Sequence, residues 1–131
     1  MEQHAGLALA VVALLLTKHF LFDFVFQTRF QLANKHIYGH PGGLSHAALH
    51  ALGTLSAFLI VTPSWRLGAA ILAVEFVAHY HIDWTKELIL RRTRWTYADG
   101  RYWAVFGGDQ LIHGLGYVLI AWVLTVRSWP W

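Results

Sequence analysis

The stretch GLALAVVALLLTKHFLFDFVF at residues 6–26 decides the fold class of this chain. At about 1.5 Å per helical residue, this apolar run is long enough to cross a hydrocarbon layer of about 30 Å. No basic segment precedes it and no small-residue cleavage site follows it, so we expect a retained helix rather than a signal peptide. The stretch therefore predicts a membrane-spanning helix.

Three further apolar runs lie outward from this stretch, at residues 44–61, 65–90 and 103–126. Turn-forming residues separate the first two runs at 34–43, and Thr62, Pro63 and Ser64 separate the next two. Short connections favour antiparallel neighbours. We therefore predict an all-α, polytopic membrane protein: a four-transmembrane-helix, antiparallel up-and-down bundle formed by a single domain over residues 1–131.

The composition supports this class, because 56% of the residues are apolar and only 13% are charged, unlike an average soluble protein. The basic residues lie beside apolar segments rather than in an arm, so we expect no nucleic-acid partner. The chain has no cysteine, which excludes disulfides, thiolate metal ligands and cysteine nucleophiles. Any bound metal must therefore be held by nitrogen and oxygen.

Basic residues are concentrated on one side of the predicted bundle. The first and third loops hold Arg29, Lys35, Arg91, Arg92, Arg94 and Arg101, whereas the other side holds Arg66 and Arg127. Cytoplasmic loops carry the excess of Lys and Arg. We therefore predict a multi-pass protein of the inner (plasma) membrane with both termini on the non-cytoplasmic side.

Side chains able to bind metal occur in pairs four residues apart, one pair in each predicted helix, and this spacing places both members on one face. In the first and third segments the pair lies near the C-terminal end, and in the second and fourth near the N-terminal end. An antiparallel bundle thus brings all pairs to the cytoplasmic leaflet. The predicted ligands are His19 with Asp23, His46 with His50, His79 with Asp83, and Asp109 with His113.

Imidazoles and carboxylates without sulfur suit one or two divalent transition-metal ions, Zn²⁺ first, with Mn, Fe or Ni as alternatives. Left unpaired in lipid, such groups would each cost on the order of several kcal/mol, so they must pair, neutralise or bind a cation. The structural alternative is that they form hydrogen bonds between helices and hold the bundle together.

Two residues extend the polar stripe of the third segment and are predicted to be catalytic. Glu75 lies four residues before His79 as a candidate general base, and Lys86 lies three residues after Asp83 as a candidate anion contact. Alternatively, Lys86 pairs with Asp83 and extends to the membrane interface. Gln27 and Tyr117 continue other stripes and are expected to orient imidazoles.

Four short motifs carry a resemblance to a known family: HFLFDFVFQ at 19–27, SHAALH at 45–50, HYHIDWTK at 79–86 and DQLIH at 109–113. Together they resemble the small bacterial membrane proteins grouped as domain of unknown function 3307, over nearly the whole chain. The paired-histidine helices are also similar, more loosely, to inner-membrane proteins described as predicted metal-dependent hydrolases.

The ligand set and these resemblances favour a metal-dependent hydrolase of a lipid or a lipid-linked ester or phosphoester. Its expected partners are membrane lipids, a lipid-like substrate and, as an alternative to a monomer, a second copy of the chain. A divalent-cation or proton transport or sensing protein is the main alternative, since Asp, Glu and His inside helices also mark ion pathways. An oxidative non-haem metal enzyme and a structural subunit are the further alternatives.

Overall fold

The computed structural model describes residues 2–127, and residues 1 and 128–131 of the predicted domain lie outside the described part. Over the described residues every regular element is a helix, so the predicted all-α class is confirmed. The elements are α1 (Glu2–Phe20), the π-helical η1 (Leu21–Val25), α2 (Arg29–Asn34), α3 (Pro41–Thr54), the 3₁₀-helical η2 (Leu55–Leu59), α4 (Trp65–Thr93) and α5 (Gly100–Arg127).

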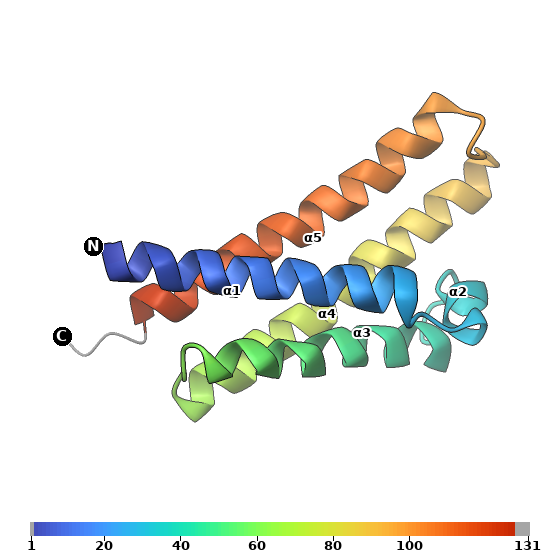
Figure 1. Cartoon of the computed structure of the whole chain (residues 1–131). Coiled ribbons are helices and arrows are strands. Elements are labelled where there is room, and N and C mark those ends of the chain that lie inside the picture. The colour runs from blue at the N-terminus through green and yellow to red at the C-terminus, as the bar shows by residue number, and fades with distance from the viewer. Residues whose placement is uncertain (1, 128–131) are drawn as a thin grey trace.

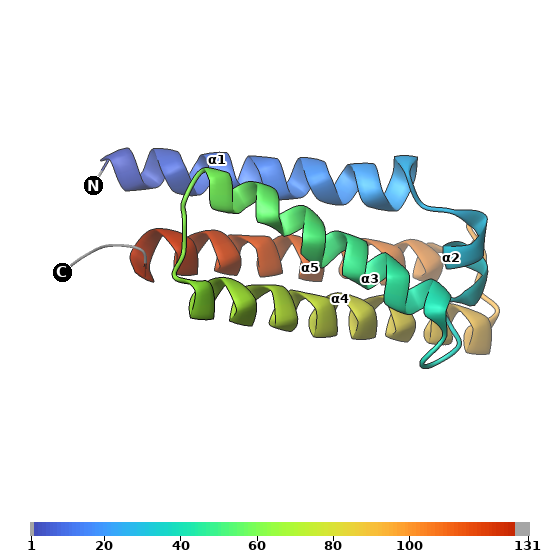
Figure 2. The ribbon, with the colours of Figure 1, turned by 90° about the horizontal axis from the view of Figure 1, so that it is seen from below.

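The four long segments run alternately in opposite directions, as Figures 1 and 2 show. Contacts join α1 to α5 and α3, α3 to α4, and α4 to α5. The start of α1 and the end of α5 lie at one end of the bundle, while α2 and the α4–α5 loop lie at the other (Figure 2). We call these the terminal end and the loop end.

The predicted first helix is not a single regular helix. After Phe20 the backbone widens into the π-helical η1, which contains Asp23. A short helix, α2, then follows that the apolar pattern did not predict. Its signal is a capping box, in which Thr28 Oγ1 accepts from the Gln31 amide at 3.2 Å and Gln31 Oε1 accepts from the Thr28 amide at 3.0 Å.

The second predicted helix, 44–61, begins earlier and tightens before its end. Pro41 stands at the first position of α3, where its missing N–H costs nothing, and His40 Nδ1 accepts from the Gly42 amide at 3.0 Å. Beyond Thr54 the chain continues as the 3₁₀-helical η2. The third helix begins at Trp65 as predicted, because Ser64 Oγ caps it through the Leu67 amide at 3.3 Å.

Among the described residues, more polar than apolar side chains are buried, which reverses the usual distribution of a soluble protein. The apolar core occupies the terminal end and comprises Val11, Leu15, Ala57, Ile71, Tyr117, Ala121 and Leu124. The outer surface is apolar: Leu59, Trp65 and Leu9 are 88%, 77% and 70% exposed. Two segments, His4–Val25 and Gly100–Val126, are long and apolar enough to cross a membrane.

Candidate metal centre

The four predicted ligand pairs converge inside the bundle, one pair from each long segment. Three overlapping groups form, and within each group one donor atom per residue lies within 4.8 Å of the others. His79 belongs to two groups and His113 to two. The groups are Asp23 with His46, His50 and His79; His19 with His79 and His113; and Asp83 with Asp109 and His113. Every residue that the four-residue spacing selected is thus brought to one place.

The first group, which we call the central quartet, consists of Asp23, His46, His50 and His79. Asp23 Oδ1 lies 3.0 Å from His46 Nε2 and 3.1 Å from His50 Nε2. Around a tetrahedral Zn²⁺ with Zn–N bonds near 2.0–2.1 Å, neighbouring donor atoms stand about 3.3 Å apart. The spacing of this oxygen and these nitrogens therefore fits a transition-metal ion, with His79 as the fourth donor.

Several donor atoms of the central quartet are buried without a hydrogen-bond partner. They are both ring nitrogens of His79 and Nδ1 of His50, whereas His50 Nε2 and Asp23 Oδ1 contact each other at 3.1 Å. The two rings stack with their centroids 3.8 Å apart, so neither supplies the other with a hydrogen bond. Buried polar groups in proteins nearly always find a partner, because leaving them without one is costly. The arrangement matches what a cation held by these atoms requires.

His19 has both of its ring nitrogens engaged by neighbours. Its Nδ1 lies 3.0 Å from the Tyr117 hydroxyl, and its Nε2 lies 3.1 Å from Gln110 Oε1 and 3.2 Å from Asp23 Oδ2. Gln110 Nε2 also donates to Asp23 Oδ2 at 3.4 Å. These contacts hold one carboxylate oxygen of Asp23 and leave Oδ1 facing the central quartet. His19, a predicted ligand, is therefore placed to orient the Asp23 carboxylate.

Tyr117 and Gln27, expected to orient imidazoles, both contact them. Tyr117 meets His19, as described above. The Gln27 side-chain nitrogen lies 3.1 Å from Nδ1 and 3.2 Å from Nε2 of His46. Gln110, which the sequence analysis did not single out, follows Asp109 directly and bridges it to Asp23, donating to Asp109 Oδ2 at 3.0 Å. A glutamine beside a predicted ligand was the signal that could have found it.

Three buried lysines neutralise the negative charge of three of the four buried carboxylates. Lys18 Nζ lies 2.6 Å from Glu75 Oε1, and Lys35 Nζ lies 2.6 Å from Asp83 Oδ2. Lys86 Nζ lies 3.2 Å from Asp109 Oδ2 and 3.5 Å from Asp83 Oδ1. Among the described side chains Asp23 is thus the buried carboxylate that contacts imidazoles but no lysine. The uncompensated negative charge lies in the central quartet.

Lys86 and Glu75, the predicted catalytic pair, lie on opposite sides of the ligand set. Lys86 is buried against Asp83 and Asp109, so it turns inward and does not extend along the surface. Glu75 belongs to none of the three groups. One oxygen of Glu75 pairs with Lys18, and the other, Oε2, is buried without a partner.

Lys18 is the main polar residue that the sequence analysis missed. Its ammonium donates to the His50 carbonyl at 2.9 Å, to Thr54 Oγ1 at 3.0 Å and to Glu75 Oε1 at 2.6 Å, which satisfies all three protons. This contact requires α3 to pass close to α1: a Cβ on Gly53 would fall 2.7 Å from Lys18 Cδ. The available signal was a lysine inside the first apolar run, residues 6–26.

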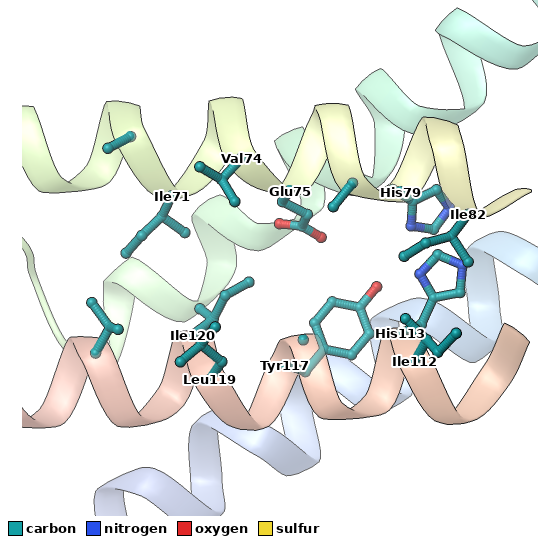
Figure 3. A pocket seen from close by; sticks show the side chains of 14 residues that line it. Ile71, Val74, Glu75, His79, Ile82, Ile112, His113, Tyr117, Leu119 and Ile120 are labelled. Carbon is teal, nitrogen blue, oxygen red and sulfur yellow. The ribbon is translucent and has the colours of Figure 1, made fainter. Parts of the chain in front are cut away.

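Two cavities reach the ligand set from different sides. One, of about 320 Å³, lies between α4 and α5 and is lined by Glu75, His79, His113 and Tyr117 together with apolar side chains (Figure 3). The other, of about 330 Å³, lies toward the loop end and is lined by Asp23, Gln27, Lys35, Lys86 and Gln110 among others. We call them the apolar cavity and the polar cavity.

The fold and the site define a class: an all-helical protein that buries ionisable side chains inside a bundle and exposes apolar ones. The chain belongs to the family described as protein of unknown function (DUF3307), whose model matches residues 11–130. The resemblance carried by the four short motifs is therefore confirmed, and the matched region contains every predicted ligand. No curated protein and no solved structure matches the chain. The looser likeness to metal-dependent hydrolases stays a prediction.

Proposed function

We propose that this protein spans the inner membrane several times and holds a divalent transition-metal ion, with which it hydrolyses a lipid or a lipid-linked ester or phosphoester. The observation that carries the proposal is the central quartet, whose donor atoms lie within 4.8 Å of one another and include buried ring nitrogens of His50 and His79 that make no hydrogen bond. A protein interior seldom tolerates such atoms unless they have a function.

The membrane location rests on the apolar surface and the polar interior. Two segments qualify as spans by length and composition. We propose that the other two long segments also cross the bilayer. In α4 the charged residues Glu75, Asp83 and Lys86 point inward and do not face lipid, while α3 and η2 together continue from Pro41 to Leu59. We propose that both termini lie on the non-cytoplasmic side, because cytoplasmic loops carry the excess of basic residues.

The donor set favours a single ion, with Zn²⁺ first and Mn, Fe or Ni as alternatives. Three imidazoles and one carboxylate without sulfur are compatible with each of these metals. A second ion beside Asp83 and Asp109 would compete with Lys35 and Lys86 for the same oxygens. Of the one or two ions expected, we therefore propose one, in the central quartet.

In the proposed hydrolysis, the ion and the surrounding side chains have different roles. If three of the four quartet residues held the ion, a position would stay open for water, and the ion would act as a Lewis acid that lowers the pKa of that water. Glu75 is the general base that we assign, because its Oε2 has no partner and it lines the same cavity as His79. Lys86, which lines the polar cavity, is placed to meet an anionic product.

A cation or proton pathway is the less favoured alternative. Such a pathway needs polar groups along the whole bundle, but the terminal end is closed by an apolar core that includes Val11, Leu15 and Leu124. Polar residues at one end only favour a site over a channel. Oxidative chemistry would differ from hydrolysis in the identity of the metal.

The proposal is tested by elemental analysis of detergent-purified protein. We expect wild-type protein and His81→Ala to retain the metal and His50→Ala to lose it. His81 is a matched control because it is an exposed histidine of the same bundle, bonded to Tyr38 and to the Val77 carbonyl outside the ligand set. Wild-type protein free of transition metal, with chelators leaving lipid-ester and phosphoester hydrolysis unchanged, would overturn the proposal.

A further inference from the structure

The apolar cavity between α4 and α5 is divided into a polar part and an apolar part (Figure 3). Glu75, Tyr117, His79 and His113 form the polar part, and His79 also belongs to the central quartet. Toward the terminal end the walls are entirely aliphatic. This apolar part is lined by Ala70, Ile71, Val74, Leu119, Ile120 and Val123.

We propose that this cavity binds one hydrocarbon chain of an amphiphilic lipid, with the chain in the apolar part and the polar group beside Glu75 and His79. A ligand that filled only the polar part would leave the aliphatic walls without a partner, whereas a wholly apolar ligand would bury Glu75 Oε2 unpaired. An amphiphile with a hydrogen-bond donor at its head, such as a hydroxyl group, satisfies both parts.

The position of the cavity also fits a lipid that enters from the bilayer. Val74 of α4 and Leu119 of α5 both line the apolar cavity and are 67% and 58% exposed. The cavity therefore reaches the outer surface of the bundle between these helices. A chain could therefore enter sideways without crossing the polar cavity. Recognition of the chain is independent of the metal, but its role as the substrate tail rests on the proposed function.

A larger side chain at Gly116 would fill part of the apolar cavity. Gly116 lines the cavity, and a Cβ built on it meets no atom within 4 Å, so a larger side chain would enter open space. Gly107 lies on the same helix, is equally open at its Cβ and lines neither the apolar cavity nor the polar cavity. Gly116→Leu and Gly107→Leu therefore form a matched pair.

The experiment is photolabelling of the purified full chain with a long-chain fatty alcohol that carries a diazirine near its methyl end. We expect labelled peptides from α4 and α5 that contain Val74 and Ile120, and equal labelling of Gly107→Leu. We expect Gly116→Leu to lower labelling about tenfold, because the leucine side chain would occupy the space that the hydrocarbon chain needs. Val74→Phe, at a largely exposed position, should lower labelling as well. This second variant shows that loss of labelling does not depend on misfolding of Gly116→Leu.

Metal content measured on the same samples separates the two proposals. Equal labelling in all variants, with metal bound, would refute lipid binding in the apolar cavity and leave the proposed metal centre standing. Reduced labelling in Gly116→Leu and Val74→Phe, with no metal in wild-type protein, would support lipid binding in the apolar cavity and overturn the proposed metal chemistry.

Discussion

Lys18 Nζ lies 2.6 Å from Glu75 Oε1, and both side chains are almost fully buried between α1, α3 and α4. This pair lies next to the apolar core of the terminal end, at the boundary of the polar interior. Because the remaining protons of Lys18 are accepted by His50 and Thr54, the ammonium joins three helices at one point.

Removing one partner of this pair should destabilise the bundle strongly. We expect Lys18→Met to lower the free energy of unfolding by about 3–5 kcal/mol, because Glu75 would remain buried and uncompensated. The double variant Lys18→Met, Glu75→Gln should recover part of that loss, since it leaves no net charge behind. Denaturant unfolding in a fixed detergent measures both, and a double variant as unstable as the sum of its single changes would refute the coupling.

A lysine neutralises Asp109 but not Asp23, so we expect replacement by asparagine to affect metal binding differently at the two positions. Asp23 contacts imidazoles and Gln110 but no lysine, so Asp23→Asn should reduce bound metal to background. Asp109 is compensated by Lys86, so Asp109→Asn should retain on the order of one ion per chain. Elemental analysis of both purified variants decides the matter. Equal loss of metal in the two variants would show that the ion lies across the whole ligand set and not in the central quartet.

Removing the metal should lower thermal stability. A ligand that binds only the folded state at about one hundred times its Kd contributes about 2.7 kcal/mol, which chelation would remove. We expect a fall in Tm with chelator and its recovery with one of Zn²⁺, Mn²⁺, Fe²⁺ or Ni²⁺, which would also identify the preferred ion. His50→Ala should show no response to chelator, and a response equal to that of wild-type protein would argue against the central quartet.

The convergence of the ligands could be predicted because it depends on periodicity alone. A spacing of four places His46 with His50, or His79 with Asp83, on one helical face, and antiparallel neighbours then bring these faces to one depth. No knowledge of side-chain contacts is needed for that step. For the same reason the stretches at 65–90 and 103–126 predicted α4 and α5 closely.

The lysine partners could not be predicted in the same way, because they depend on contacts between distant segments. Lys35 meets Asp83 only because α2 turns the chain back over α4, and the apolar pattern did not indicate α2. The widened turn at η1, which contains Asp23, also has no signal in a pattern of four. Sequence therefore indicated which residues gather, whereas the structure was needed to see which carboxylate lacks a lysine.

The proposed topology predicts the side from which each loop can be labelled. The chain contains no cysteine, so a single introduced thiol reports its own position. Thr62 and Ala98 are both exposed and lie in the loops at the terminal end and the loop end. We expect a membrane-impermeant maleimide to label Thr62→Cys in intact spheroplasts but Ala98→Cys only after permeabilisation, because the basic residues beside Ala98 favour the cytoplasm. The reverse pattern would place the metal centre in the opposite leaflet, and labelling of both sites in intact spheroplasts would contradict four spans.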